Sequence, residues 1–382
     1  MADQARGREA VLVHGATGYT GRLVCGALRR RGVPFAIGGR SASRLGELAA
    51  ELGGVETCVV DLGSPGSIDA AVAGRRVVCA CAGPFVEIGE PMLAGCARAG
   101  VHYVDTTGEQ RFVLDAITRH HATALASGAC VVPGMAFEIA LADWGADLAA
   151  RRVGGAPDAI DVAYLNQPPS GGAATTRGTK RSIVATLAAA DGQQFVDGAL
   201  RRESSAAVVR TFPRSTGEAV HAVSFPSPEA VVVPSHTGAR TVRTFMAMDA
   251  LSARTLQATR GVTPLLVRMT RGLIDRAIAR GAEGPDASGR SQTTFEVLVE
   301  ARRGDRRARL WMTGGDPYGL TAELQAYAAE RLLRGTTVRG VVAPSVAVPP
   351  HEAISALAFT GLRVVEDPSN ADAAPPAPSA RA

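Results

Sequence analysis

The first 135 residues alternate short apolar runs with amphipathic helical patterns, and this alternation constrains the fold more than any other feature. Six apolar runs have the character of β-strands: AVLVH, PFAIG, VETCVV, RVVCACA, VHYVD and ACVVPG. Near-continuous apolar strands joined by helices form a parallel sheet that is covered on both faces. The sequence therefore predicts a doubly wound α/β domain of the Rossmann type over residues 9–134.

A glycine-rich loop lies between the first predicted strand and the first predicted helix, in the stretch VLVHGATGYTGRLV. Gly15 and Gly18 permit a tight turn close to a pyrophosphate, and Gly21 lets the helix pack against the sheet. The free N–H groups at the start of the helix favour phosphate. A purely structural turn is the alternative, but the strand–loop–helix context favours a dinucleotide. The expected contacts are Gly15, Ala16, Thr17, Gly18, Tyr19, Thr20 and Gly21.

The end of the second predicted strand indicates which nicotinamide cofactor binds. NAD enzymes carry Asp or Glu about 20 residues past the glycine motif, where it bonds the ribose 2′-hydroxyl. Residues 35–45 read FAIGGRSASRL and contain no acid. Arg40 and Arg44 can pair with a 2′-phosphate, and Ser41 can donate to it. Alternatively, Arg40 is solvated and Ser41 is a helix N-cap. We predict NADP(H), with Asp61 either at the adenine edge or capping a loop.

The regular alternation of strand-like and helical segments ends after residue 134. Several strand-like runs interrupted by helices predict a second α+β domain with a largely antiparallel sheet over residues 135–319. One interruption, GVTPLLVRMTRGLIDRAIARG, predicts an amphipathic helix whose apolar character is broken by arginines. Helices in residues 320–367 are expected to return to the first domain, whereas residues 1–8 and 368–382 are predicted to be disordered. An exposed sheet edge would permit a homodimer.

Composition excludes several classes of function. A formal charge of +5 over 382 residues does not indicate nucleic-acid binding. The densest basic run, Arg302–Arg309, is typical of a hairpin turn, with an anionic ligand as the alternative.

None of the six cysteines has CxxC spacing, which predicts no metal site and reduced, buried thiols. The N-terminus does not resemble a signal peptide and no uncharged apolar run is long enough to span a membrane, so we expect a cytoplasmic protein.

Four segments together resemble the saccharopine dehydrogenase-like oxidoreductases, and among them the trans-acting enoyl reductases of polyketide and lipid pathways: GATGYTG, GGRSASRL, AGPFVEIGEPMLAGCARAGVHYVDTTGE and GGDPYGLTAE. The resemblance runs from about Glu9 to Val365. It implies an NADP-binding Rossmann domain and a second domain that closes over the nicotinamide. The fourth strand should then end beside the nicotinamide ribose, with Asp105, Thr107, Gly108 and Glu109 along the cleft. The expected ribose contacts are Ala82, Gly83, Pro84 and Phe85.

The chain departs from the pattern of this family at two places. Ala80 stands where an Asn is often found, three residues before Gly-Pro. The segment AFEIALAD keeps Phe137, Asp143 and an acid at Glu138, but Ile139 and Leu141 replace a Ser and a Pro. Substrate contacts are therefore not carried over to this segment.

The tyrosines constrain the chemistry. None of the five is followed by Lys at the fourth position, so the chain lacks the Tyr-x-x-x-Lys pair of short-chain dehydrogenases. Reduction of a C=C bond beside a thioester carbonyl needs an acid that protonates the α-carbon. The candidates are Tyr318, Tyr103 and Glu109. Alternatively, Tyr318 packs in a turn before a helix, and Glu109 stabilises a helix N-terminus.

Three functions remain open. The first is an NADPH-dependent reductase of a small-molecule or carrier-bound enoyl thioester. The second is a saccharopine-type imine or amino-acid reductase, which needs paired arginines for two carboxylates. The third is a non-catalytic NADP-binding redox sensor. The stretch PSGGAATTRGTKRS could form a lid whose Thr176, Arg177 and Lys180 hold an anionic group such as phosphopantetheine, or it is a surface loop.

Overall fold

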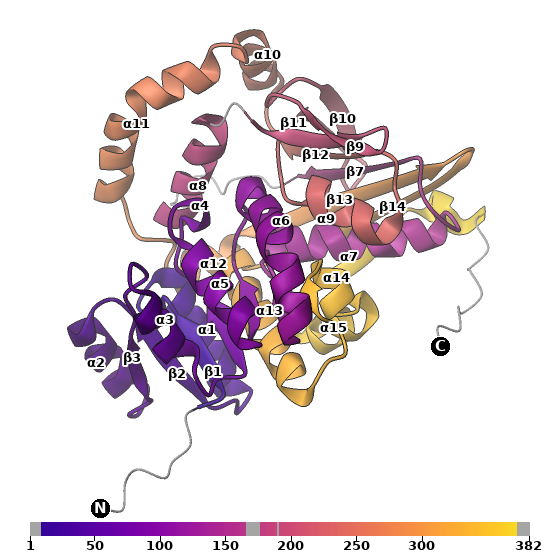
Figure 1. The fold of residues 1–382 in the computed structure, drawn as a ribbon. Coiled ribbons are helices and arrows are strands. Elements are labelled where there is room, and N and C mark those ends of the chain that lie inside the picture. Colours follow the sequence, from indigo (N-terminus) through magenta and orange to yellow (C-terminus); the bar gives the residue numbers. More distant parts are fainter. Residues whose placement is uncertain (1–8, 166–175, 189–190, 373–382) are drawn as a thin grey trace, which may run out of the picture. The chain divides into compact units, whose positions relative to one another are not determined.

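A computed structural model describes residues 9–165, 176–188 and 191–372 and divides them into two compact units. Unit 1 comprises the described residues up to Thr107, with Phe112–Phe137 and Tyr318–Val348. Unit 2 comprises Gly108–Arg111, Glu138–Pro317 and the described residues from Pro349 onward. The segment predicted over residues 320–367 is therefore divided between the units (Figure 1).

Unit 1 is built on a parallel sheet, and its described residues form seven strands in the order β15-β6-β5-β4-β1-β2-β3. Six of them follow the 3-2-1-4-5-6 order of a doubly wound dinucleotide-binding fold, which confirms the predicted fold class. Each neighbouring pair is parallel. The strands are β1 (Val11–His14), β2 (Phe35–Gly39), β3 (Thr57–Val59), β4 (Val77–Ala80), β5 (His102–Asp105), β6 (Cys130–Val132) and β15 (Gly340–Val341).

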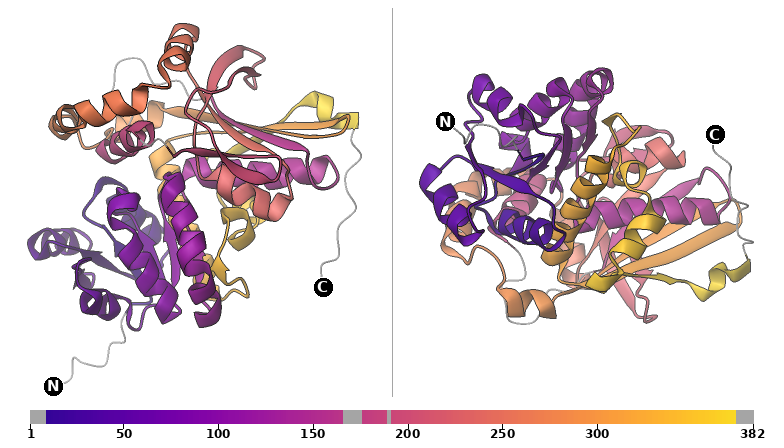
Figure 2. Two further views of the ribbon diagram at one scale, coloured as in Figure 1. Left: turned by 45° about the horizontal axis from the view of Figure 1, so that its top comes forward. Right: turned by 90° about the horizontal axis from the view of Figure 1, so that it is seen from below.

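Helices connect these strands and lie on both sides of the sheet (Figure 2). Local capping sets where two of them begin: the hydroxyl oxygens of Ser41 and Ser64 accept the N–H groups of Arg44 and Ser67. The helices are α1 (Tyr19–Arg30), α2 (Ala42–Glu51), α3 (Pro65–Val72), α4 (Phe85–Ile88), α5 (Glu90–Ala99), α6 (Gln110–Ser127), α13 (Pro317–Arg334) and α14 (Pro344–Ala347).

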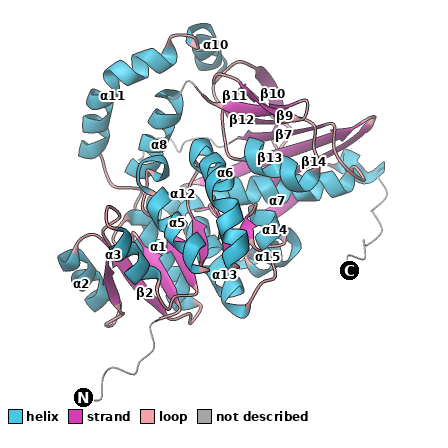
Figure 3. Cartoon of the chain, in the orientation of Figure 1, coloured by secondary structure: helices cyan, strands magenta, loops and turns pink. Residues whose placement is uncertain are grey.

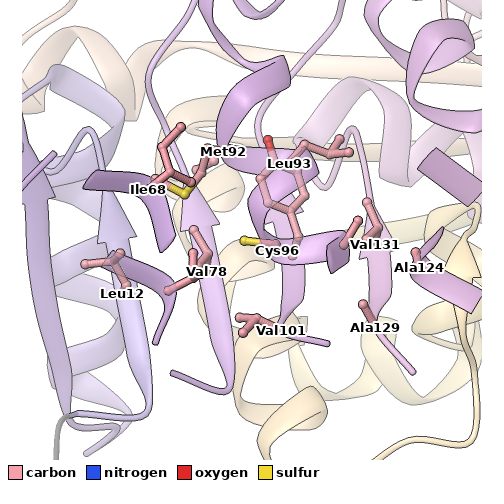
Figure 4. Close-up of a cluster of buried hydrophobic side chains, with 14 of the residues drawn as sticks. Leu12, Ile68, Val78, Met92, Leu93, Cys96, Val101, Ala124, Ala129 and Val131 are labelled. Carbon is pink, nitrogen blue, oxygen red and sulfur yellow. The ribbon is translucent and has the colours of Figure 1, made fainter. Parts of the chain in front are cut away.

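The core of unit 1 lies between the sheet and the helices α3, α5 and α6. Figure 4 shows Leu12, Val78 and Val131 from the strands facing Ile68, Met92 and Cys96 from the helices. Four of the six cysteines are buried and two, Cys58 and Cys81, are half-buried; all six are free thiols. This apolar packing holds the carboxyl ends of the strands at one edge of the sheet, where a dinucleotide binds in such folds.

Unit 2 contains a mixed, mainly antiparallel sheet, in which the described residues form nine strands. The order β10-β11-β12-β7-β13-β14-β16 is antiparallel except between β12 and β7, and β8 and β9 pair at its side. The strands are β7 (Ala159–Tyr164), β8 (Gln193–Val196), β9 (Ala199–Arg202), β10 (Val209–Pro213), β11 (Ala219–Ser224), β12 (Val242–Ala247), β13 (Thr294–Arg303), β14 (Arg306–Gly315) and β16 (Arg363–Glu366).

The basic run Arg302–Arg309 forms the predicted hairpin turn between β13 and β14. Its arginines pair within unit 2: Arg302 with Asp161, and Arg307 and Arg309 with Glu300. These ion pairs favour the hairpin interpretation over an anion site.

The helices of unit 2 complete the secondary structure, which Figure 3 distinguishes by colour. They are α7 (Phe137–Arg152), α8 (Arg177–Ala188), α9 (Glu229–Thr237), α10 (Ala250–Thr259), α11 (Thr263–Arg280), α12 (Ala287–Gln292) and α15 (Pro350–Ala356), with short 3₁₀ helices at Ala358–Thr360 and Pro368–Asp372. Within the described residues, no helix is both long enough and apolar enough to cross a membrane.

Candidate functional site

The glycine loop has the geometry expected of a phosphate-binding turn. Gly15 follows β1 with φ of +79°, and a Cβ atom there would lie 2.7 Å from the amide nitrogen of Ala82. The N–H of Gly18 donates to the carbonyl oxygen of Gly15 at 3.0 Å. A Cβ atom on Gly21 would lie 2.3 Å from that same carbonyl oxygen. Gly15 and Gly21 therefore each have a steric reason to be glycine, and the loop leaves a backbone cradle that a side chain would fill.

The helix after the loop presents its N-terminus to this cradle. Gly18 is the N-cap of α1 and has no side chain that could cap the helix, and the first turn carries no acidic residue. Its amide groups and the positive end of the helix dipole favour a phosphate. Beneath the loop, burial lowers the pKa of His14 to about 4, so this side chain is neutral at physiological pH.

Arg44 reaches the glycine loop from α2. Its Nη2 donates to the carbonyl oxygen of Thr17 at 3.2 Å. Ser41 is the N-cap of α2, as one of the two interpretations expects, and its hydroxyl also lies 3.2 Å from that of Ser43. Arg40 ends the turn after β2 with an exposed side chain. Arg44 thus contacts the loop, while Arg40 and Ser41 directly follow β2, the strand that pairs with β1 just before the loop.

Asp61 caps its own loop. Its Oδ1 accepts the N–H of Gly63 at 2.9 Å, and its own N–H donates to the hydroxyl of Ser67 at 2.9 Å. The side chain is exposed after β3. The loop-capping alternative therefore has a direct geometric basis.

The ends of β5 and β6 are held by polar contacts that the sequence did not predict. Oδ1 of the buried Asp105 accepts the N–H groups of Thr107 and Gly134 at 2.9 and 2.8 Å. Nε2 of Gln325, from α13, donates to the carbonyl oxygens of Asp105 and Met135 at 2.7 and 2.8 Å. One amide thus ties together two strand ends. The sequence offered one indication of this contact: Gln325 is a polar residue on an otherwise apolar face of α13.

Phe85 differs from its expected place beside the nicotinamide ribose. Its side chain is buried and packs against Phe112, with ring centroids 5.4 Å apart. The ring belongs to the hydrophobic core because α4 turns it inward. Gly83 is exposed in the same loop and Ala82 is partly exposed, so the backbone of this loop can still line a cofactor.

The three candidate proton donors lie in different surroundings. The ring of Tyr318 is partly exposed and contacts the ring of Tyr19 edge-on within unit 1. Tyr103 is fully buried in the core, and burial raises the pKa of its hydroxyl well above the usual value. A proton donor must reach the substrate, so this placement argues against Tyr103. Glu109 belongs to unit 2, where the Ser182 hydroxyl donates to its Oε1 at 2.9 Å.

A half-buried carboxyl group in unit 2, that of Glu138, adds a candidate from the segment AFEIALAD. Burial raises the pKa of Glu138, in the first turn of α7, to about 7, and the charge of Glu229 adds to the effect. Glu229 accepts the hydroxyl of Tyr164 and is fully buried. Further along α7, Asp143 lies 2.6 Å from Nε2 of His236. The segment AFEIALAD indicated Glu138 and Asp143, whereas their partners Glu229 and His236 lie about 90 residues further along the chain and could not be predicted from it.

The predicted lid lies partly outside the described residues, which resume at Thr176. The Arg177 guanidinium donates twice to the carbonyl oxygen of Gly281, at 2.9 and 2.6 Å, and the hydroxyl oxygens of Thr176 and Thr179 lie 3.0 Å apart. Arg177 therefore ties the start of α8 to the end of α11. Among the described residues, no group of three or more His, Cys, Asp or Glu side chains is arranged to hold a metal ion.

Comparisons with known proteins agree with the geometry of the loop. Residues 15–124 match a family model described as NAD(P)H-binding. The chain is 34% identical over 149 residues to a trans-acting enoyl reductase of Mycobacterium leprae, covering 37% of this chain and 36% of that protein. It is 32% identical over 134 residues to a trans-acting enoyl reductase of Mycobacterium bovis, covering 34% and 32%. The matched region spans about a third of the length of these curated relatives.

The likeness in fold extends over both units. Saccharopine dehydrogenase (L-Glu forming) of Saccharomyces cerevisiae, in its apo form, matches with a TM-score of 0.60 at 12% identity, covering 94% of this chain and 99% of that chain. Such low identity shows the fold alone. Together these findings confirm a saccharopine dehydrogenase-like fold, with a Rossmann-type domain that matches an NAD(P)H-binding family model and a second α+β domain.

Proposed function

We propose that this protein is an NADPH-dependent oxidoreductase that reduces the C=C bond of an enoyl thioester. The carrying observation is the glycine loop between β1 and α1, with Arg44 donating to its Thr17 carbonyl oxygen and no acid at the end of β2. The backbone of Gly15, Gly18 and Gly21 would hold the pyrophosphate, and the amides at the start of α1 would complete its hydrogen bonds.

The arginines after β2 support NADP(H) over NAD(H). A 2′-phosphate carries charge that the exposed Arg40 can pair with, and Arg44 lies between that position and the loop. An NAD site would instead need a carboxylate to bond the 2′-hydroxyl. The N-cap role of Ser41 leaves lone pairs and a proton on its hydroxyl for a further bond.

The reaction follows from what an enoyl thioester requires. A dinucleotide held by Gly15, Gly18 and Gly21 would supply hydride chemistry at the β-carbon of the substrate, and its oxidation would balance the reduction of the C=C bond. The protein must orient the acyl chain, stabilise the enolate oxygen and deliver a proton to the α-carbon. Among the three initial candidates, we assign the proton to Tyr318, because its partly exposed side chain lies beside the glycine loop.

The relatives suggest the form of the substrate. Both matched proteins are named trans-acting enoyl reductases. We extend that activity to this chain as part of the proposal, with an acyl thioester on a carrier or a small molecule as the substrate.

Three arginines of unit 2 are engaged in ion pairs, which weighs against their use by a saccharopine-type imine reductase. That chemistry needs free arginines for two carboxylates of the substrate. Arg210, Arg214 and Arg243 are instead paired with Asp161, Glu296 and Glu203. Binding a dicarboxylate there would require breaking part-buried ion pairs, which is costly.

NADPH oxidation tests the proposed reaction. The purified full chain is incubated with NADPH and a series of 2-enoyl thioesters of increasing chain length, with 2-oxo acids plus amines in parallel. We expect oxidation with enoyl thioesters and formation of the saturated thioester. Oxidation with 2-oxo acids and amines alone would favour the imine reductase, and tight NADPH binding without any oxidation would favour a redox sensor.

A further inference from the structure

Helix α11 has a second apolar face that points to solvent. Its packing face carries Val267, Ile274 and the buried Ile278, on the side of the helix that contacts α8. The other face begins at Val262 and continues with apolar residues 3, 4, 7 and 11 positions further on. Residues at these spacings lie on one side of a helix. Its side chains are well exposed, including Leu265 at 60%, Met269 at 75% and Leu273 at 68%. We call Val262, Leu265, Leu266, Met269 and Leu273 the apolar stripe.

The segment that carries the stripe is strongly basic. Residues 250–280, which the structure describes throughout, contain six arginines and one acid, Asp275. This excess of five positive charges equals the formal net charge of the whole chain. Asp275 pairs with Arg271 across one helical turn, at 3.6 Å. Arg276 and Arg280 extend the line of the stripe, at spacings of 14 and 18 residues from Val262.

A cavity of about 740 Å³ lies where α10 meets α11, within unit 2. Arg254 and Arg260 line it together with the hydroxyl-bearing Ser204, Ser205 and Thr263. Cationic and hydroxyl donors of this kind suit an anionic group such as a phosphate. Val262 and Leu265 of the stripe flank Thr263 and Pro264 of its wall, so an anion-binding hollow and an exposed apolar ridge are adjacent.

Helix α10 places a further apolar side chain on the same segment. Ala253 and Leu256 pack against the sheet at β10 and β11, which anchors the helix. Leu251 is on its outer side and exposed. Figure 1 shows α10 and α11 as consecutive helices beyond the strands of the sheet in unit 2, with α8 beside α11.

We infer that the apolar stripe of α11 and the arginines of α10 and α11 dock this protein on the surface of an anionic lipid membrane. A helix of 18 residues is about 27 Å long and can lie in the plane of the interface. Its leucines would enter the acyl boundary while the arginines meet the phosphates, as in monotopic amphipathic helices. The cavity would receive one lipid headgroup.

Charge and shape favour this occupant over others. A second copy of the same face would bring arginine against arginine, which is unfavourable. The apolar stripe projects from the helix and is flanked by arginines, so a protein partner would need a groove of matching shape with acidic walls. A lipid surface needs no such groove, because it deforms around the stripe. The inference does not depend on the proposed reductase activity, because it rests on a different surface.

Vesicle binding tests the inference on the full chain. Flotation is measured with vesicles of phosphatidylcholine alone and with vesicles that contain about a third phosphatidylglycerol. We expect the protein to bind the anionic vesicles and to bind pure phosphatidylcholine vesicles at least tenfold more weakly. High salt should release the protein from the anionic vesicles. Equal binding to both vesicles, or binding to neither, would overturn the inference.

Two variants identify the surface, each with a matched control. The triple variant Leu265→Ser, Met269→Ser, Leu273→Ser removes exposed apolar side chains and should lose vesicle binding at unchanged thermal stability; Leu125→Ser, an exposed leucine of α6, should bind normally. The double variant Arg276→Gln, Arg280→Gln should bind anionic vesicles about fivefold more weakly per arginine. Its control, Arg202→Gln, Arg339→Gln, makes the same change in net charge at other exposed sites.

The same variants separate the competing occupants. Binding that falls equally in the control pair would show non-specific charge attraction and overturn the inference. A wild-type dimer that the triple variant converts to a monomer, measured by light scattering without lipid, would assign the stripe to a second copy. Intact vesicle binding by the triple variant would exclude α11 as the docking helix.

Discussion

The ring of Tyr19, the first residue of α1, meets the ring of Tyr318, near the start of α13, edge-on with centroids 5.4 Å apart and planes at 84°. Residues 299 positions apart in the sequence thus meet at the glycine loop. The contact gives the loop a lateral support from a helix that follows the whole of the second unit in the sequence. It also places the Tyr318 phenol beside the loop that we propose to hold the pyrophosphate of the cofactor.

The role of Tyr318 can be separated into support and chemistry. Tyr318→Phe keeps the ring and removes the hydroxyl, so we expect NADPH affinity to be kept and turnover of an enoyl thioester to fall by about 10²-fold or more. Tyr318→Ala also removes the ring contact and should weaken NADPH binding by about 2- to 10-fold. Fluorescence titration and single-turnover kinetics measure the two effects. Normal turnover by Tyr318→Phe would remove Tyr318 as the proton donor.

The arginines after β2 should discriminate between the two cofactors. Arg40→Ala and Arg44→Ala should each weaken NADPH by about 10- to 100-fold, because a charge-assisted hydrogen bond is worth about 1.5–3 kcal/mol. NADH, which lacks the 2′-phosphate, should be affected much less. Arg339→Ala, an exposed arginine elsewhere in unit 1, serves as the control. An equal loss of affinity for both cofactors would remove the substituted arginine from the phosphate site.

Two glycines in helices provide a matched pair of steric tests. Gly21→Ala would place a Cβ atom 2.3 Å from the Gly15 carbonyl oxygen, so we expect the loop to shift, NADPH binding to be lost and stability to fall by about 1–3 kcal/mol. Gly46→Ala in α2 meets nothing within 4 Å and should raise stability by about 0.5–1 kcal/mol. Urea unfolding and cofactor titration measure both. Unimpaired NADPH binding by Gly21→Ala would contradict the assigned loop geometry.

The half-buried Glu138 predicts a pH dependence of stability. Its pKa is about 7 in the folded state and near 4.5 when exposed, so between these values the folded state binds more protons. This group therefore makes the free energy of unfolding fall as pH rises from about 4.5 to 7. Glu138→Gln removes the effect, and its stability relative to wild type should rise by a few kcal/mol between pH 5 and pH 8. A difference that stays constant across this range, in urea unfolding, would show that Glu138 does not titrate as described.

The alternation of strands and helices was sufficient to predict a doubly wound parallel sheet, because right-handed crossovers leave few arrangements of six such strands. The glycine loop could also be predicted, for a different reason. The spacing of Gly15, Gly18 and Gly21 is a local feature of the sequence, and the backbone conformations that glycine permits are known. The turn at Arg302–Arg309 followed from apolar runs on either side.

The burial of Tyr103 and Phe85 argues against their expected roles. Both residues lie in segments whose sequence pattern does not show which way a side chain points. Tyr103 sits in a strand that is covered on both faces, so the sequence could not distinguish a buried ring from one at the edge. Phe85 is turned into the core by a helix of four residues, which is too short to show a periodic pattern. The ties made by Gln325 to Asp105 and Met135 join residues about 200 positions apart and depend on tertiary packing.

The most direct test of the central claim is a fluorescence titration of the wild-type chain with NADPH and with NADH under identical conditions. The account predicts that NADPH binds at least tenfold more tightly, because Arg40 and Arg44 stand where an NAD site would carry an acid. Equal or tighter binding of NADH would contradict it.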